Sequence, residues 1–365
     1  MLKVTRWFSY LFISSLIAFL SPLFISKSFA ATNVPTGPSY TTSPVTLNVA
    51  IHPGTSYTKT IQIMNNTSQP VPIIMRVDVF GAYGSTGQAE INAPSSNNPS
   101  PSYVHFSPAS FTAQPKVWSL VQMTINLPKT ASLGYYLAIV FQPNTPNAIA
   151  APGHNIFKSS NSILVLVDTQ SANEIRSVEV GQFSTNKSLF EYLPVNFSVN
   201  IHNSGNIFLN PSGDIYISRS ANLTHTVATI GVNSAGGNVL PNSNRVFNES
   251  WSTGFPVFEN KIVNGNTVTD KKGNPIEQLK WDLANIKDFR FGRYYAGLTL
   301  VYNNGTRIVP LKAVISFWVI PWKLLLVLLV VLVLIGFALW SVGRGIYRKI
   351  KKIKANKTFR RKKNQ

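Results

Sequence analysis

Alternation of apolar and polar residues at every second position constrains this chain more than any other feature. In VNFSVNI (195–201) the apolar residues are separated by Asn or Ser, and VQMTINL (121–127) and PIIMRVDV (72–79) alternate in the same way. A period of two places the apolar side chains on one face of a half-buried β-strand. No comparable helical periodicity lies between the two long apolar runs at the ends of the chain. The pattern therefore predicts an all-β fold for the region between them.

The predicted strands are short and are separated by turns rich in Gly, Pro, Asn and Ser, at spacings typical of immunoglobulin-like β-sandwiches. The pattern also repeats. IQIMNNTSQPV (61–71) resembles VNIHNSGNIFL (199–209), and SLGYYLAIVF (132–141) resembles FGRYYAGLTLVY (291–302). Both pairs occur in the same order along the chain, which indicates two similar halves.

We therefore predict two tandem immunoglobulin-like β-sandwich domains, residues 31–169 and 174–318, with QSANE (170–174) as the linker. One larger sheet domain with coincidental similarity between its halves is the alternative. The chain contains no cysteine, so disulfides cannot stabilise these domains, and the hydrophobic cores must do so alone.

The N-terminus has the features of a secretory signal peptide. Lys3 and Arg6 precede an apolar stretch, and Ser28-Phe29-Ala30 has the small-x-small pattern of a cleavage site. This predicts a signal peptide of residues 1–30, with an uncleaved N-terminal anchor as the alternative.

A second apolar run near the C-terminus predicts one transmembrane helix within residues 319–343. Leu324 to Gly343 is free of charge and is about 30 Å long as a helix, which matches the hydrocarbon core of a bilayer. Trp322 and Trp340 stand where aromatic residues meet the membrane surface.

The charge distribution predicts the topology. From Ser341 onward there are 11 Lys or Arg residues and no acid, which places the tail (344–365) in the cytoplasm and the body outside the cell, as in a single-pass type I protein of the cell membrane. The formal net charge of +20 is therefore concentrated at the ends. Residues 31–322 carry 18 Lys or Arg and 13 Asp or Glu, so no nucleic-acid partner is expected.

The segment LPKTA (127–131) resembles the site at which sortases cut proteins and attach them to the cell wall. Such a site needs a flexible segment just before the membrane span, but here a whole predicted sandwich follows it, and Leu127 continues a predicted strand. We therefore interpret LPKTA as a loop, with the C-terminal helix as the permanent anchor.

The sequence offers no signature of catalysis, cofactor binding or metal binding. The five histidines are scattered and lack metal-ligand spacing, and neither a Gly-rich phosphate loop nor a G-x-S-x-G motif is present. A protein that is not an enzyme is expected. An accessory subunit of an enzyme, or a hydrolase whose acids lie far apart in sequence, is the alternative.

Residues 81–106 form the most unusual stretch, which is rich in Ser, Asn, Pro and Gly. A long loop on a rigid sandwich is a common place for binding sites. Tyr83, Tyr103 and Phe106 are our candidate binding residues, because aromatic faces beside amide groups suit sugars and peptides. The alternative is an insertion whose last residues simply begin the next strand.

Five segments together resemble the WxL-interacting proteins of Gram-positive cell surfaces. They are HPGTSYTKTIQIMNNTSQPV (52–71), NSGNIFLNPSGDIYI (203–217), VLPNSNRVFNESW (239–251), the Gly-x-Tyr-Tyr strand (292–295) and FWVIPWK (317–323). The resemblance implies that the first sandwich binds peptidoglycan or another wall polymer, and that the second sandwich docks a partner carrying a WxL domain. A tethered adhesin, or an assembly chaperone that pairs an edge strand with another surface protein, is the alternative function.

Overall fold

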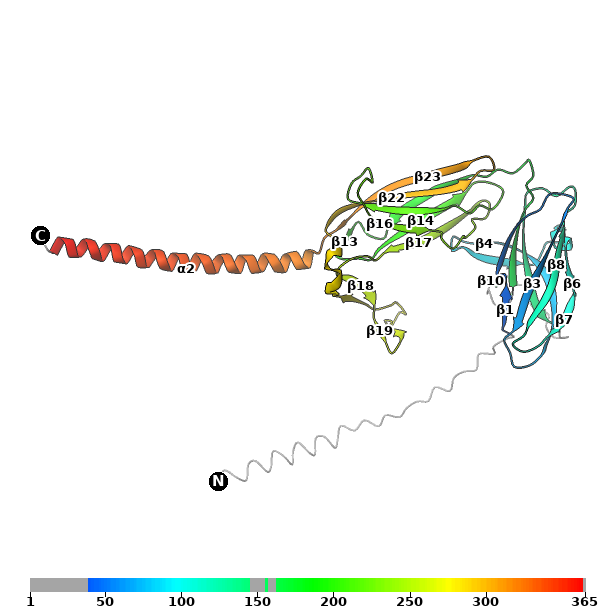
Figure 1. Cartoon of the computed structure of the whole chain (residues 1–365), viewed down its shortest axis with the longest axis horizontal. Coiled ribbons are helices and arrows are strands. Elements are labelled where there is room, and N and C mark those ends of the chain that lie inside the picture. The colour runs from blue at the N-terminus through cyan, green and yellow to red at the C-terminus, as the bar shows by residue number, and fades with distance from the viewer. Residues whose placement is uncertain (1–38, 145–154, 157–161, 364–365) are drawn as a thin grey trace, which may run out of the picture. The chain divides into compact units, whose positions relative to one another are not determined.

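The computed structural model describes residues 39–144, 155–156 and 162–363, and the predicted signal peptide lies outside them. All described strands and the C-terminal helix belong to one compact unit, Tyr40–Gln365. Figure 1 shows two groups of strands followed by one long helix. The predicted fold class, two immunoglobulin-like sandwiches with a C-terminal helix, is confirmed.

The first sandwich packs two sheets face to face. One sheet has the order β1 (Tyr40–Ser43), β3 (Ser56–Asn65), β8 (Trp118–Asn126), β6 (Val104–Ser107). The other has the order β10 (Asn155–Ile156), β5 (Gln88–Asn92), β4 (Val71–Tyr83), β9 (Gly134–Pro143), β11 (Ser162–Asp168), β2 (Thr46–Ala50). β7 (Ser110–Ala113) also pairs with β4, and the 3-10 helix η1 (Ser100–Tyr103) precedes β6.

Alternation along the strands builds the first core, as the sequence predicts. On β8 the side chains of Val121, Met123 and Ile125 are buried, and Ile61 on β3 lies directly opposite Val121. On β4 only Ile73 and Met75 of the predicted face are buried. Further along β4 the opposite face is buried as well, because Phe80 packs in a second cluster that includes Phe208 and Leu240 of the second sandwich.

The second sandwich also has two sheets. One is β12 (Val178–Thr185), β14 (Val195–Asn203), β17 (Ser243–Trp251). The other is β13 (Leu189–Phe190), β23 (Ile308–Val319), β22 (Gly292–Asn303), β15 (Ser212–Ser218), β16 (Thr226–Val232). Aromatic rings fill the core between them. Trp251 meets the ring of Tyr294 at 5.2 Å between centroids, and Phe317 packs against both.

An insertion between β17 and β22 adds two small ribbons, which the sequence patterns do not predict. β18 (Val257–Asn260) pairs with β21 (Glu277–Lys280), and β19 (Ile262–Val263) pairs with β20 (Asn266–Thr267). The 3-10 helix η2 (Leu283–Asp288) then leads back to β22, and Asp282 caps it by accepting a hydrogen bond from the backbone N–H of Ala284.

Ion pairs hold the segment between the sandwiches in place. The Arg176 guanidinium lies 2.5 Å from the Asp168 carboxylate at the end of β11 and 2.7 Å from the Glu174 carboxylate. The Asn206 side chain accepts a hydrogen bond from the backbone N–H of Ile175. The predicted linker, residues 170–174, is therefore restrained by the ion pair at Asp168 before it and by the hydrogen bond at Ile175 after it.

The C-terminal helix α2 runs from Trp322 to Lys363. Its segment Trp322–Arg348 is long and apolar enough to cross a bilayer, and none of the most apolar part is buried in the protein. The helix thus begins within the predicted span and continues into the basic tail.

Candidate protein-docking site

Strand β23 has a free edge along most of its length. On one side it pairs with β22 over its whole length, from Ile308 opposite Asn303 to Val319 opposite Gly292. On the other side β13 covers only Trp318 and Val319. Within the part of the chain that the structure describes, no second strand pairs with residues 308–317.

The inward-facing side chains of β23 are buried beside β13 and only partly buried beyond the end of β13. Phe317 and Val319, beside β13, are 1% and 0% exposed. Leu311, Ala313 and Ile315 face the same core but are only partly buried. All five positions share one face of one strand, so burial of that face decreases where the pairing with β13 ends.

The backbone groups of β23 are available for pairing. The Trp318 N–H donates to the Ser188 carbonyl at 2.8 Å, so it points away from β22. Backbone N–H groups of successive residues point to opposite sides of a strand. The N–H groups of Ser316, Val314 and Lys312 therefore also point away from β22. The backbone nitrogen of Pro310 also lies on this outward side, where an edge strand tolerates a residue without an N–H group.

The outer face of β22 and β23 carries an aromatic cluster around one arginine. The Arg293 guanidinium lies 5.1 Å from the Tyr295 ring centroid and 6.0 Å from that of Trp318, and it donates to the Ser316 hydroxyl at 3.0 Å. Trp318 is 44% exposed and Val314 is 55% exposed. Trp, Tyr and Arg are the residues that most often dominate protein–protein interfaces.

Sequence reasoning missed this edge. IVPLKAVISFWV (308–319) does carry the signal, since apolar residues alternate from Val309 to Val319. Pro310 within such a run marks an edge strand. The last residues of this segment, in FWVIPWK (317–323), instead resemble the entry to a membrane helix.

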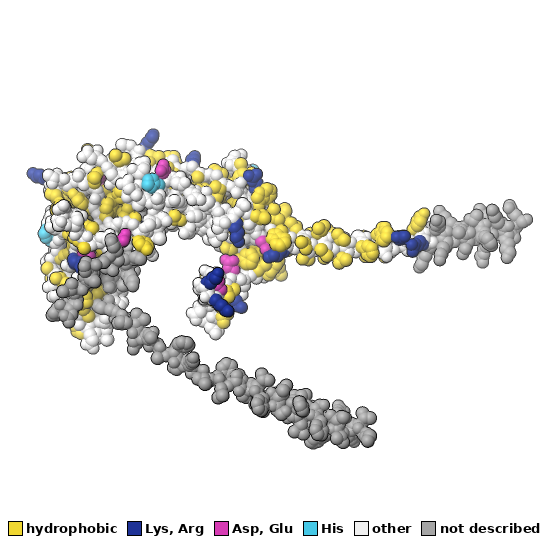
Figure 2. All heavy atoms as spheres, turned by 180° about the vertical axis from the view of Figure 1, so that it is seen from behind, with side chains coloured by type: hydrophobic (Ala, Val, Ile, Leu, Met, Phe, Trp, Pro, Cys, Tyr) yellow, Lys and Arg dark blue, Asp and Glu magenta, His cyan; other side chains and the backbone are white. Residues whose placement is uncertain are grey.

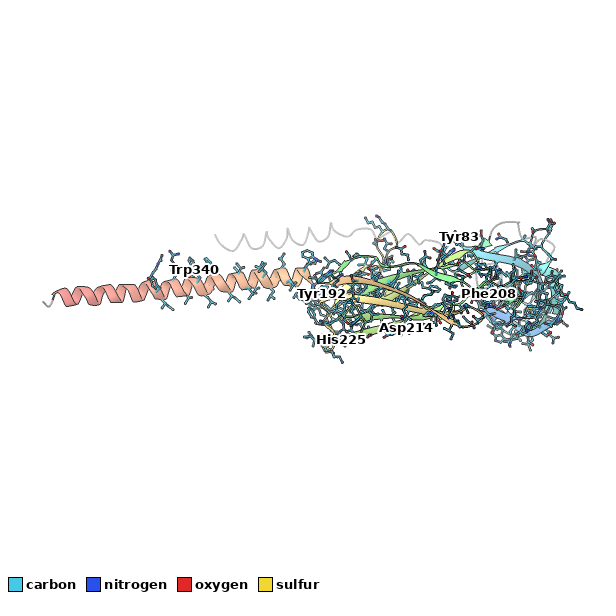
Figure 3. The ribbon with its side chains drawn as sticks, turned by 90° about the horizontal axis from the view of Figure 1, so that it is seen from above. Tyr83, Tyr192, Phe208, Asp214, His225 and Trp340 are labelled. Carbon is cyan, nitrogen blue, oxygen red and sulfur yellow. The ribbon has the colours of Figure 1, made fainter. Side chains whose placement is uncertain are left out.

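The structure separates the three predicted binding residues. Tyr83 ends β4 at the turn to β5 and is 40% exposed, and Figure 3 labels it at the upper edge of the body in that view. Tyr103 ends η1, and its ring meets Tyr135 edge-on at 5.6 Å. Phe106 lies on β6, and both it and Tyr103 pack against the first core. Only Tyr83 offers its ring to solvent without such packing.

Residues 81–106 are not one long loop. They hold the end of β4, all of β5, η1 and most of β6. The local turn chemistry explains this: the Thr86 hydroxyl donates to the Tyr83 carbonyl, and the Asn98 side chain accepts from both the N–H and the hydroxyl of Ser100. The LPKTA segment does fall between strands, β8 and β9, with Leu127 and Ala131 buried.

Titratable groups do not gather into a reactive site in the described ranges. No cluster of three His, Asp or Glu side chains suitable for a metal occurs there. Asp78 is buried but pairs with Arg76 at 2.6 Å. Burial raises the pKa of Tyr40 to about 12, as expected of a phenol enclosed by a core.

No protein-family model matches the chain, and no curated protein matches it either. Solved structures of similar fold do exist. The class 5 fimbriae chaperone CfaA is 12% identical, with 76% of this chain and 98% of that chain covered and a TM-score of 0.34.

Two further structures illustrate the range of the similarity. The CupB2 chaperone of Pseudomonas aeruginosa is 9% identical, with 74% and 97% coverage and a TM-score of 0.28. A PapD-like domain of human CEP192 is 14% identical, with 40% and 98% coverage and a TM-score of 0.24. The chain is therefore distantly similar to PapD-like immunoglobulin folds, and similarity at this level carries no functional inference.

Proposed function

We propose that this chain is a membrane-anchored extracellular docking protein whose strand β23 accepts a strand from another exported protein. The observation that carries the proposal is the change in burial along β23. Phe317 is buried beside β13, whereas Ile315 and Leu311 on the same face are only partly buried. An added strand would complete the core at the edge.

Strand addition would satisfy outward N–H and C=O groups and bury apolar surface together. Moving one partly buried Leu or Ile to full burial contributes about 1 kcal/mol. The exposed Trp318, Val314 and Arg293 beside the edge supply the side-chain contacts through which such a partner would be selected.

The first half of the strand carries features that discourage indiscriminate pairing. Pro310 lacks a donor and Lys312 places a charge on the edge, and natural sheets use both devices against edge-to-edge aggregation. The proposed pairing is therefore centred on residues 313–317.

Anchoring follows from α2. Its apolar segment, Trp322–Arg348, would cross the cell membrane, and the basic residues after it would remain in the cytoplasm. Trp340 lies on this helix (Figure 3). The body, from the first sandwich to Val319, would then face the outside of the cell.

The family resemblance adds a specific partner and a wall ligand to this proposal. The partner at β23 would be a WxL-domain protein, and the first sandwich would hold peptidoglycan through Tyr83. Exposure of Tyr83 beside a polar turn supports that assignment. The packing of Tyr103 and Phe106 supports a structural role for these two residues instead. The protein is proposed to act without catalysis.

Photocrosslinking in intact cells tests the docking proposal. A benzoylphenylalanine at Lys312, on the free edge, should capture an exported protein. The same group at Thr229, an exposed residue on β16 at the opposite edge of the same sheet, is the matched control and should capture none.

A proline variant makes the test specific to backbone pairing. Val314→Pro removes an outward N–H and leaves the ladder to β22 intact, as Pro310 does naturally. The adduct at Lys312 should disappear in this variant while the melting temperature changes little. An adduct of unchanged yield in Val314→Pro, or equal adducts at Thr229, would contradict strand addition.

A further inference from the structure

Exposed apolar side chains gather beside the start of α2. Trp281 is 53% exposed, Leu283 70% and Ile286 60%, and Phe289 and Phe291 are also exposed. We call these five residues the juxtamembrane patch. Figure 2 shows hydrophobic side chains gathered where the second sandwich meets the helix. An exposed segment with this many large apolar side chains is typical of a surface that contacts a partner or a membrane.

Strand pairing fixes the patch close to the helix. Phe291 directly precedes Gly292, which pairs with Val319 at the end of β23. Only Ile320 and Pro321 separate Val319 from α2. The Ile320 N–H donates to the Phe190 carbonyl at 2.8 Å, which further restrains the point where the chain leaves the sandwich.

A second set of contacts joins the insertion to the same point. The Lys323 ammonium lies 2.8 Å from the Glu191 carboxylate, and the next residue, Tyr192, meets the Trp281 ring at 6.3 Å. Figure 3 shows Tyr192 near the start of the helix. An ion pair, a peptide bond and a ring contact therefore connect Lys323, the second residue of α2, to Trp281.

We propose that the juxtamembrane patch lies in the outer leaflet of the membrane, with Trp281, Leu283 and Ile286 inserted at the level of the lipid headgroups. The proposal rests on the proposed crossing of the membrane by α2. A helix that begins at Trp322 places the bilayer surface at the end of β23, which is where the patch lies. Trp and aliphatic side chains on a short segment are suited to this interface.

The near-neutral charge of the insertion predicts similar contact with zwitterionic and with anionic lipids. Residues 257–291 carry six Lys or Arg and five Asp or Glu, so the insertion has almost no net charge. Its contact with lipid would depend on apolar insertion and would be insensitive to salt. Such a contact would hold the second sandwich, and with it the free edge of β23, at a fixed height above the membrane.

Spin labels on the full chain in phosphatidylcholine nanodiscs test this inference. The chain has no cysteine, so each single-cysteine variant carries one label. Leu283→Cys and Ile286→Cys report on the patch. Ile308→Cys is the matched control, since Ile308 is 68% exposed and lies at the far end of β23, about 33 Å from Trp318. Val333→Cys in α2 reports on the membrane span.

We expect labels at 283 and 286 to be about threefold less accessible to aqueous nickel chelate than the label at 308, and more accessible to oxygen. Labels at 283 and 286 that behave like the label at 308, with the label at 333 in lipid, would overturn the patch and leave the anchoring intact. A label at 333 that is accessible to nickel would show that the anchoring itself fails, and the patch with it. Shielding of 283 and 286 from both reagents would indicate a protein contact and would also overturn the proposal.

Discussion

At the scale of the residue, two tyrosines that look alike in the sequence differ in the structure. Tyr83 ends a strand and exposes 40% of its surface, whereas Tyr103 is held edge-on by Tyr135. Sequence alone could not separate them, because the packing partner of Tyr103 lies 32 positions further along the chain. A side chain that binds ligand and one that supports the fold respond differently to truncation.

Truncation of each tyrosine is therefore expected to have a distinct result in the full chain. Tyr83→Ala should weaken sedimentation with cell-wall sacculi about tenfold, because one aromatic contact with a sugar is worth about 1–2 kcal/mol. The melting temperature should not change. Tyr103→Ala should instead lower the free energy of unfolding by about 1–3 kcal/mol. Wild-type protein that never sediments with sacculi would end the wall-binding assignment.

Glu249 provides a test by pH. It lies on the inward row of β17 opposite Phe197, and burial raises the pKa of its carboxyl despite a hydrogen bond from the Asn233 backbone. The folded state therefore disfavours the charged form, so stability decreases as pH rises through the interval between the unfolded and the folded pKa.

Glu249→Gln should accordingly melt at a higher temperature than wild type at neutral pH, and the two curves should converge in acid, below the ordinary pKa of a glutamate. Glu179→Gln, which removes an exposed carboxylate of β12, is the control and should change little. A Glu249→Gln protein that melts below wild type at pH 7 would contradict the burial argument.

At the scale of the element, strands with regular alternation were predictable and their neighbours were not. The segments at 121–127 and 195–201 match β8 and β14, because burial of one face fixes the period of the sequence. The free edge of β23 and the insertion after β17 depend on which strands lie beside them. That information is non-local, since β13 and β23 are separated by more than a hundred residues.

The segment after β11 is the element whose rigidity is easiest to test. Arg176 bridges Asp168 and Glu174, and all three side chains are largely buried. Arg176→Ala should lower the free energy of unfolding by about 2–3 kcal/mol, because two carboxylates lose their partner. Lys280→Ala, which breaks an exposed pair with Glu259, should cost less than about 1 kcal/mol. Equal effects in chemical denaturation would contradict a fixed connection.

At the scale of the whole molecule, the proposed topology puts both proposed binding surfaces outside the cell. The sandwiches precede α2 and the basic residues follow it. Protease added to protoplasts should digest the body up to Val319 and spare an epitope at the C-terminus. A protected body with an accessible C-terminus would reverse the topology and remove the basis for docking an exported partner.

Pairing of a partner strand with β23 changes the protection of individual backbone amides, so residue-resolved hydrogen exchange of the full chain can detect it. In the free protein the outward amides of Val314 and Ser316 should exchange rapidly, while those of Ala313 and Ile315, which face β22, should be protected. After addition of the protein captured at Lys312, we expect the amides of Val314 and Ser316 to become protected as well. Amides at 314 and 316 that exchange equally fast with and without a bound partner would show that docking occurs elsewhere.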